Sequence, residues 1–210
     1  MKKITRTKLR EFIRKQATEE KTLDVGAGDK NYVSFFPNIT TIDINPERKP
    51  DVVADVCQLP FGDNEFGLIL CTEVLEHLPN PAAAIKEIKR VLKPGGKLVA
   101  TTRFIFPIHD APGDYFRYTK YGLRELFKDW KIEYLEEEAN SLETIAVLLQ
   151  RLIFQAKFKP NKLIKGGLWL LIKIFQALSL LKIREFGNIN QTCDEKNILT
   201  SGYYLIARKI

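Results

Sequence analysis

Apolar positions along this chain follow two spacings that alternate through most of its length. The first pattern is a short run rich in apolar residues, which predicts a strand. Such runs cover residues 21–25, 40–44, 51–56, 66–71, 97–102, 131–137 and 203–208. Between several of them, apolar residues recur every three or four positions, the spacing of a helix with one buried face. Strands that alternate with helices predict a mostly parallel sheet with helices on both of its faces.

Local signals place the elements more closely. The segments with helical spacing are residues 4–20, 29–36, 80–92 and 119–130. Pro81 suits the first turn of the third helix, and Lys93-Pro94-Gly95-Gly96 is expected to end it. The run 66–71 is continuously apolar rather than alternating, which is typical of a strand covered on both faces.

Residues 141–184 interrupt this alternation with a long apolar and helical stretch. Between 144 and 184 the chain has no Asp or Glu, and its cations there are Arg151, Lys157, Lys159, Lys162, Lys165, Lys173, Lys182 and Arg184. Lys173 interrupts the apolar run and Gly166-Gly167 weakens its start, so a full bilayer span is not expected. Three roles stay open: an amphipathic foot on an anionic membrane surface, a lid over an acceptor site, and a contact with a second subunit.

Composition narrows the class of protein. With 45% apolar and 28% charged residues, the 210-residue chain is neither disordered nor fibrous, and its length favours one domain. The N-terminal residues 1–21 lack the apolar run of a signal peptide. Two histidines argue against a His-rich metal site, and three scattered cysteines predict neither a disulfide framework nor a zinc knuckle. The cysteines are Cys57, Cys71 and Cys193.

A glycine turn follows the first expected strand and carries the clearest chemical signal. Asp24-Val25-Gly26-Ala27-Gly28 allows the backbone to approach a ligand at the carboxyl end of the sheet. A dinucleotide site needs a third glycine where this chain has Asn31, which disfavours a nicotinamide-dependent oxidoreductase. The Asp24 carboxylate would repel phosphate and attract a cation. The turn therefore predicts a positively charged nucleoside ligand without phosphates.

Two further carboxylates end the next two expected strands. Asp43 stands where a carboxylate can accept both hydroxyls of a ribose. Asp55 stands where an acceptor could take the exocyclic amine of adenine.

Five segments together resemble one family. LDVGAGD, IDINP, ADVCQLPF, LILCTEVLEHL and VLKPGGKLV occur in the order and spacing of class I S-adenosylmethionine-dependent methyltransferases. The resemblance covers about residues 20–138 and the last strand. It implies an α/β fold, a Rossmann-like sandwich with a seven-stranded sheet and a helical insert before the last strand. We expect a single domain 1–210, whose parts are an N-terminal helix 1–20, a cofactor-binding core 21–138, the basic insert 141–184 and the last strand 202–210.

The resemblance implies S-adenosyl-L-methionine as cofactor. Gly26 and Gly28 would line its methionine part beside Asp24, Asp43 would hold the ribose, and Asp55 with the Val56 amide would read the adenine. The full set of expected cofactor residues is Asp24, Gly26, Ala27, Gly28, Asp43, Ile44, Asp55, Val56, Cys71 and Glu73. The family often has a further glycine where this chain has Lys30.

Acceptor residues are expected in the loops after the fourth and fifth strands. His109 with Asp110 is the first candidate for a general base and its orienting group, and His77 is a further candidate. These residues could instead brace the loop, and His77 could cap its helix or bond the backbone. No metal is expected from His109, Asp110 and Asp114. The loop resembles one in methyltransferases associated with surface-polysaccharide assembly.

The sequence therefore predicts a methyltransferase that favours an oxygen atom of a small-molecule, glycan or lipid-linked acceptor. We expect it in the cytoplasm, including peripherally on the inner face of a membrane. A nucleic-acid methyltransferase is the first alternative, but Cys71-Thr72-Glu73-Val74 replaces the Asn/Asp-Pro-Pro-aromatic motif of its amino-directed members. A non-catalytic module that only binds the cofactor is the second. The sequence does not determine the oligomeric state.

Overall fold

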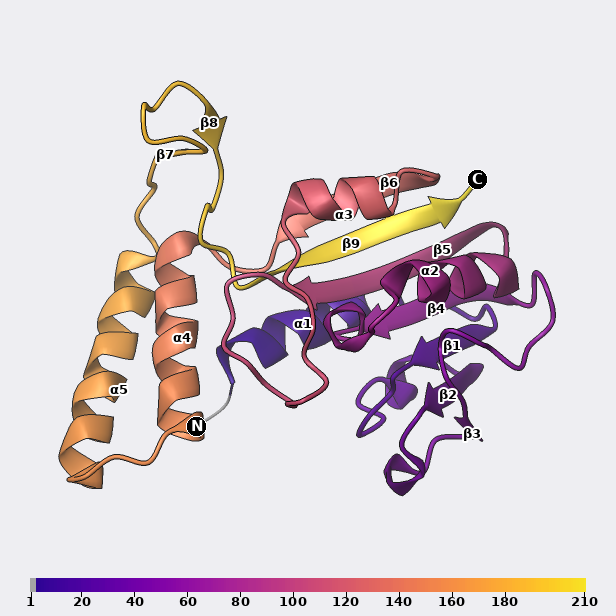
Figure 1. The fold of residues 1–210 in the computed structure, drawn as a ribbon, viewed down its shortest axis with the longest axis horizontal. Coiled ribbons are helices and arrows are strands. Elements are labelled where there is room, and N and C mark those ends of the chain that lie inside the picture. The colour runs from indigo at the N-terminus through magenta and orange to yellow at the C-terminus, as the bar shows by residue number, and fades with distance from the viewer. Residues whose placement is uncertain (1–2) are drawn as a thin grey trace. The chain divides into compact units, whose positions relative to one another are not determined.

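A computed structural model describes residues 3–210 and contains a seven-stranded sheet (Figure 1). Its strands follow the order β3-β2-β1-β4-β5-β9-β6. They are β1 (Thr22–Val25), β2 (Ile39–Asp43), β3 (Val52–Val53), β4 (Phe66–Thr72), β5 (Leu92–Arg103), β6 (Trp130–Glu137) and β9 (Gly202–Lys209). The α-helices are α1 (Ile4–Arg14), α2 (Pro81–Val91), α3 (Lys120–Leu126), α4 (Ser141–Gln155) and α5 (Asn161–Leu178). The expected mostly parallel, seven-stranded fold is confirmed.

Parallel pairing brings the functional loops to one edge of this sheet. β1 pairs in parallel with β2 and β4, β2 with β3, and β4 with β5. Val25 of β1 stands beside Ile42 of β2 and Cys71 of β4. The loops that follow β1, β2, β4 and β5 therefore all begin at the carboxyl edge, which is where ligands of such sheets bind. Figure 1 shows β9 running in the opposite direction to β5.

Several expected elements differ in the structure. The helix expected over residues 4–20 ends at Arg14, and the one expected over 119–130 spans only Lys120–Leu126. The expected helix 29–36 is only a single 3-10 turn, η1 (Val33–Phe35), and the expected strand 51–56 is reduced to β3. Lys93-Pro94-Gly95-Gly96 lies within β5 rather than in a separate loop. Phe66 pairs with Leu92, whereas Leu68 pairs with Lys97. Residues 93–96 therefore have no partners in the ladder and form a bulge. Gly95 has a φ of 71°, a left-handed conformation that glycine adopts without strain.

The chain, expected as one domain, divides into two compact units. The sheet unit comprises residues 10–103, 108–136 and 203–210. The insert unit comprises residues 104–107 and 137–202 together with the start of the chain up to Leu9.

Aromatic side chains secure the second half of α1, residues 10–14, in the sheet unit. The ring of Phe12 stacks on Tyr204 of β9 at 4.5 Å between centroids and on Tyr134 of β6 at 5.8 Å. Ile13 of the same helix is fully buried. Burial of such side chains contributes roughly 1.5–3 kcal/mol each, so this face of the helix is a substantial part of the core.

The insert unit consists mainly of the helical pair α4–α5 and the short hairpin of β7 (Glu185–Phe186) and β8 (Asp194–Glu195). Asn140 caps α4, because its side chain accepts a hydrogen bond from the Glu143 amide. Its amide nitrogen also donates to the Ser179 carbonyl after α5 at 2.8 Å, which links the ends of the two helices. The described helices include none with the length and apolar character needed to cross a membrane.

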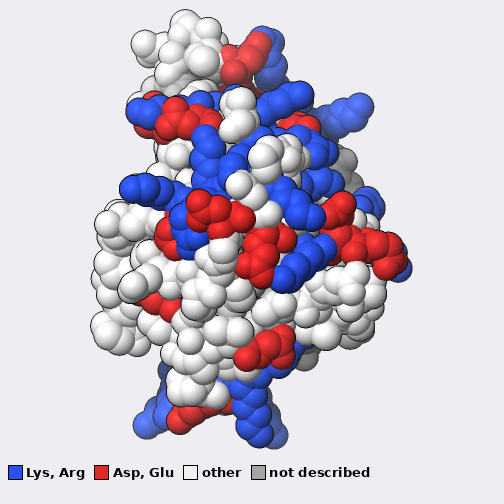
Figure 2. Space-filling model, turned by 90° about the vertical axis from the view of Figure 1, so that its right-hand side faces the viewer, with Lys and Arg blue, Asp and Glu red and all other residues white. Residues whose placement is uncertain are grey.

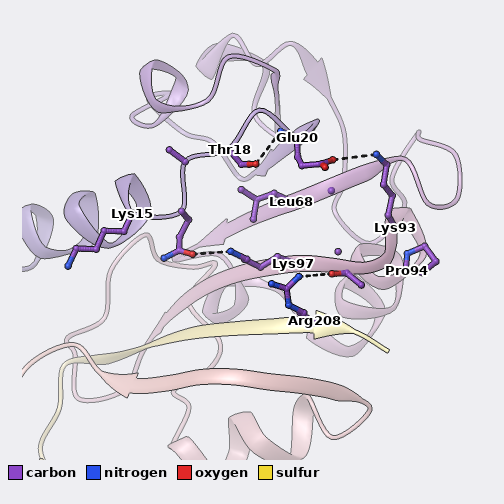
Figure 3. Close-up of a pocket in the computed structure, with 13 residues that line it drawn as sticks. Lys15, Thr18, Glu20, Leu68, Lys93, Pro94, Lys97 and Arg208 are labelled. Carbon is purple, nitrogen blue, oxygen red and sulfur yellow. Dashed lines mark hydrogen bonds and ion pairs between the residues drawn. The ribbon is translucent and has the colours of Figure 1, made fainter.

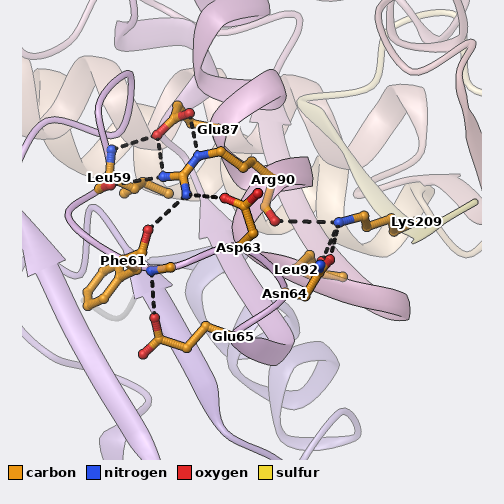
Figure 4. A network of polar contacts seen from close by, with 10 residues as sticks. Leu59, Phe61, Asp63, Asn64, Glu65, Glu87, Arg90, Leu92 and Lys209 are labelled. Atoms are coloured by element: carbon orange, nitrogen blue, oxygen red, sulfur yellow. Dashed lines mark hydrogen bonds and ion pairs between the residues drawn. The ribbon is translucent and has the colours of Figure 1, made fainter.

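Arg90 on α2 holds the loop between β3 and β4 (Figure 4). Its guanidinium donates to the Leu59 and Phe61 carbonyls at 3.0 and 2.8 Å. It also pairs with both carboxylate oxygens of Glu87 and with Asp63, each at 2.8 Å. The planar group meets these acceptors in fixed directions, which a lysine could not reproduce.

We predict that Arg90→Met lowers the free energy of unfolding by about 2–3 kcal/mol, because it leaves two carbonyls and two carboxylates without their charged donor. Urea denaturation measures the change. Lys86→Met, an exposed change on the same helix, is the matched control and should stay within about 0.5 kcal/mol of the parent. Equal losses in the two variants would contradict this role for Arg90.

Candidate functional site

The loop after β1 has the backbone shape that the sequence predicts. Gly26 and Gly28 have φ angles of 62° and 52°, both left-handed. A Cβ atom at Gly26 would lie 2.5 Å from Cγ2 of Val74, so the loop packs closely on the segment after β4. A Cβ atom at Gly28 would have its nearest neighbour 3.9 Å away, so there the need for glycine comes from φ alone.

Asp43 fastens this loop to the end of β2. Its Oδ2 accepts a hydrogen bond from the Gly28 amide at 3.0 Å, and its Oδ1 accepts one from the Asn45 amide at 2.9 Å. Each oxygen keeps a second lone pair for a further donor. The neighbouring Ile44 side chain is 69% exposed. Asp43 therefore shapes the loop in addition to any contact with a ligand.

Lys30 occupies the position where the methyltransferases that this loop resembles often have a further glycine. Its φ is 52°, so a non-glycine residue adopts the left-handed conformation at this position. Its ammonium pairs with Asp51 at 3.1 Å, and the Asp51 carboxylate accepts from the Thr41 amide and hydroxyl. The departure from the family's glycine therefore leaves the turn in place.

Asp24 is the electrostatic centre of this edge. The residue is fully buried, and neither of its carboxylate oxygens has a hydrogen-bond partner among the described residues. Burial, with a smaller contribution from the Asp43 charge, raises the pKa of Asp24 to about 7. A negative group left without donors here fits a ligand that brings positive charge, and it does not fit a phosphate.

The remaining expected cofactor residues lie near the ends of β3 and β4. Asp55 is exposed beyond β3 and accepts from the Cys57 amide at 2.8 Å, while Val56 is buried. Cys71 is fully buried in β4, and burial raises the pKa of its thiol above the usual range. Glu73 follows β4 with a φ of 56° and forms an ion pair with Arg103. The thiol is therefore a core group rather than a nucleophile.

On the acceptor side, the loop 108–118 is bound to the segment after β4. The Tyr115 and Phe116 amides donate to the Glu76 carbonyl at 2.9 and 3.1 Å. Nδ1 of His77, in the 3-10 turn η3 (Leu75–His77), lies 2.7 Å from the Gly113 carbonyl. A carbonyl can only accept, so Nδ1 carries the proton and Nε2 is the basic nitrogen. The expected backbone bond of His77 therefore exists and also fixes its tautomer.

The carboxylate beside His109 is that of Asp114 rather than Asp110. Asp114 Oδ2 accepts from the His109 amide at 2.9 Å and lies 3.5 Å from its Nδ1. Two bonds from Arg117, at 2.6 and 2.7 Å, hold the pKa of Asp114 well below its usual range. Asp110 is exposed, and its carbonyl accepts from the Gly113 amide. Asp110 shapes the turn, because its φ is 55°.

The structure also brings His77 and His109 together, although they are far apart in sequence. Their rings meet edge to face with centroids 4.7 Å apart. Glu76 lies with them and is fully buried. Glu76 directly precedes His77 in the segment after β4, where the sequence predicts acceptor-side residues, and it belongs to that expected Glu76-His77 pair.

A concave region lies at the opposite edge of the sheet, where β4 begins (Figure 3). The cavity of about 390 Å³ is lined by the start of β4 at Gly67 and Leu68 and by the bulge of β5. Lys93 there pairs with Glu20 at 3.5 Å, and Lys97 bonds Gln16 at 3.4 Å. None of the expected site residues lines this cavity.

Curated relatives match part of the chain. It is 32% identical over 123 residues to a demethylmenaquinone methyltransferase of Renibacterium salmoninarum, covering 51% of this chain and 50% of that protein. It is 31% identical over 103 residues to a ubiquinone biosynthesis O-methyltransferase of Xanthomonas oryzae pv. oryzae, covering 39% and 42%. The chain thus spans about half or less of the length of these relatives.

Solved structures match more of the chain at lower identity. The SAM-dependent methyltransferase of Methanosarcina mazei superposes with a TM-score of 0.53 at 18% identity, covering 95% of this chain and 97% of that one. The [4+2]-cyclase SpnF superposes with a TM-score of 0.62 at 18% identity, covering 96% and 80%. Because one of these proteins is described as a cyclase, the likeness supports the fold and leaves the reaction to the site.

We predict that Asp24→Asn changes how stability depends on pH. The folded carboxyl has a pKa of about 7 and the unfolded one about 3.9, so between these values only the folded state holds the proton. The free energy of unfolding should therefore fall as pH rises from about 4 to about 7, by up to about 1.4 kcal/mol for each pH unit. The variant lacks this contribution. Urea denaturation at pH 5 and pH 8 tests it, and an identical pH slope in both proteins would contradict it.

A family model described as a methyltransferase domain matches residues 23–100. This range contains Asp24, the glycine loop and Asp43, and it extends through β4 and most of β5. Residues 23–100, less than half of the chain, are therefore similar to a methyltransferase domain.

Proposed function

We propose that this protein transfers the methyl group of S-adenosyl-L-methionine to an oxygen atom of a small-molecule, glycan or lipid-linked acceptor. The observation that carries the proposal is the buried, unpartnered carboxylate of Asp24 behind a left-handed glycine loop. The methionine part of the donor carries positive charge and no phosphate. It can therefore interact favourably with the buried Asp24 carboxylate at this edge of the sheet.

Different residues of this chain would contact different parts of the donor. Asp24 would balance its positive charge, and Gly26 and Gly28 would allow the backbone to come close. Asp43 would accept from ribose hydroxyls with the lone pairs that its two amide donors leave over. Asp55 and the Val56 amide would read the adenine. When bound, the donor supplies an already activated methyl group, so the protein mainly has to orient the acceptor.

The acceptor side is expected at His77 and His109. Both lie in segments that follow the carboxyl ends of β4 and β5, and the loop 108–118 also offers Tyr115 and Phe116 as exposed rings. Rings and carboxylates suit a sugar or another hydroxyl-bearing acceptor. One relative is named as an O-methyltransferase, which supports an oxygen acceptor. Figure 2 shows a face on which Lys and Arg stand among Asp and Glu.

The test supplies labelled methyl donor to the purified protein with cell extract. The products are then separated into lipid, glycan, protein and nucleic-acid fractions. Label in the lipid or glycan fraction is the expected result. Label in nucleic acid would overturn the acceptor class, and donor binding without any labelled product would point to a non-catalytic module.

We predict that Asp43→Ala weakens donor binding by about 2 kcal/mol or more, a factor of about thirty, because it removes two bonds to the loop and the ribose acceptor. Isothermal titration calorimetry with the donor measures this change. Asp129→Ala, an exposed change after α3, is the control and should bind as the parent does. An unchanged affinity of the Asp43 variant would remove this residue from the site.

We also propose that α5 and the residues that follow it contact an anionic membrane surface. Leu163, Trp169 and Leu170 of α5 are 76%, 49% and 57% exposed, and Leu180 just after it is 86% exposed. Ile172 is the one side chain of α5 that is buried. Exposed apolar residues beside unopposed lysines are typical of helices that lie in a lipid interface. This surface would bring the enzyme to a lipid-linked acceptor.

We predict that the protein floats with vesicles that contain anionic lipid at low salt and is released by high salt. Each lysine close to the surface contributes roughly 1 kcal/mol, so Lys165→Glu with Lys173→Glu should abolish flotation. Lys128→Glu after α3 changes the charge elsewhere and should leave flotation intact. No flotation of the parent protein, or equal flotation of all variants, would end the proposal.

A further inference from the structure

Glu76, His77 and His109 form a cluster of potential metal ligands that the proposed donor site does not use. Each offers one ligand atom, and these atoms lie within 4.8 Å of one another. They come from two segments, η3 and the loop 108–118, which the bonds from Tyr115 and Phe116 to the Glu76 carbonyl hold together. The cluster is therefore built by the fold and not by neighbours in the sequence alone.

The Glu76 carboxyl is the first independent sign of a ligand. It is fully buried, and its Oε2 accepts from the Thr102 hydroxyl at 2.8 Å. Its Oε1 has no hydrogen-bond partner among the described residues. A buried carboxylate oxygen without a partner is costly, and proteins normally pair such an atom or use it to coordinate a metal. Two imidazoles beside it supply the other donors of such a site.

Both histidines have the supporting contacts that metal-binding histidines usually have. Nδ1–H of His77 donates to the Gly113 carbonyl at 2.7 Å, which directs the Nε2 lone pair to a ligand. Nδ1 of His109 lies 3.5 Å from Oδ2 of Asp114, whose carboxylate is clamped by Arg117. A backbone carbonyl on one imidazole and a carboxylate on the other fix the orientation of both rings.

Two readings of the cluster compete. In the first, Glu76 stays protonated and only braces the loop, and burial does raise the pKa of this carboxyl. In the second, a divalent cation offsets the buried charge. The oriented rings favour the second reading, because a protein acceptor lies beside Nδ1 of each imidazole, which is the arrangement that metal-binding histidines usually have.

We propose that Glu76, His77 and His109 bind one divalent transition-metal ion of the zinc type. Two imidazoles and one carboxylate suit such an ion and leave at least one coordination position open. No metal was expected from the sequence, where His109, Asp110 and Asp114 were the residues considered. The structure brings a different set together, because Asp114 supports His109 from behind and Glu76 takes the place of a ligand.

The role of the ion rests on the proposed function, whereas its binding does not. In the open position it would coordinate the acceptor hydroxyl and lower the pKa of that group. The hydroxyl would release its proton to water, and its oxygen would form the new bond to the methyl carbon. The bond from that carbon to sulfur would break, and its electron pair would stay on the sulfur.

The binding experiment uses the full chain without a histidine tag, stripped of metal with a chelator and titrated with Zn²⁺ by calorimetry. Co²⁺ absorption serves as a second probe of the same site. We expect one ion for each chain. Glu76→Gln, His77→Gln and His109→Gln should each weaken binding at least about tenfold. Glu136→Gln, an exposed carboxylate of β6, is the matched control and should not change it.

A measurement on the unmodified chain keeps the test independent of variants that fail to fold. The chain has two histidines, so a long-range ¹H–¹⁵N spectrum contains two imidazole spin systems. One equivalent of Zn²⁺ should shift both of them. Unchanged spectra, or no saturable Zn²⁺ binding, would overturn the metal site.

Donor binding measured on the same samples separates the two proposals. A protein that binds donor and no ion would refute the metal site and leave the proposed function standing. A protein that binds the ion and no donor would do the reverse. If ion and donor both bind but chelation leaves methyl transfer unchanged, the ion has no part in activating the acceptor.

Discussion

The carboxyl group of Asp24, buried in β1, is the constraint on which the rest of the donor side depends. Asp24 has no donor among the described residues, and Asp43 stands close enough to disfavour its ionisation further. Both carboxylates are fixed by the sheet, since parallel pairing sets β1 and β2 side by side. Placing the carboxyl groups of Asp24 and Asp43 behind the glycine turn destabilises the protein when no ligand is bound. It also makes the site selective for a cation over a phosphate.

Much of this arrangement could be read from the sequence, and the reasons are local. Strand ends at Val25 and Asp43 follow from short β-branched runs closed by turn residues, and the Gly26-Ala27-Gly28 turn needs left-handed backbone. The bulge at Lys93–Gly96 could not be predicted, because its residues read as a helix stop and their place in β5 depends on pairing with β4. Of the helix expected at 29–36, only the turn Val33–Phe35 forms.

The acceptor side could be predicted in outline only. Sequence reasoning identified the loop and both histidines, but it paired His109 with the adjacent Asp110. In the structure the turn at Asp110 and Gly113 reverses the chain, so the carboxylate that reaches His109 is five positions away, at Asp114. The contact between His77 and His109 joins the loops of two neighbouring strands and has no signal in local spacing.

The position of β9 in the sheet has a consequence for how the chain folds during synthesis. β9 lies between β5 and β6, yet it follows the whole insert in sequence. Until the ribosome has made α4, α5 and then β9, the strand β6 has no inner neighbour and β5 presents an unpaired edge. Edges of this kind attract other chains, and pairings between residues so distant in sequence form slowly. The sheet would therefore close after the insert has emerged, and the nascent protein would need protection from aggregation during that interval.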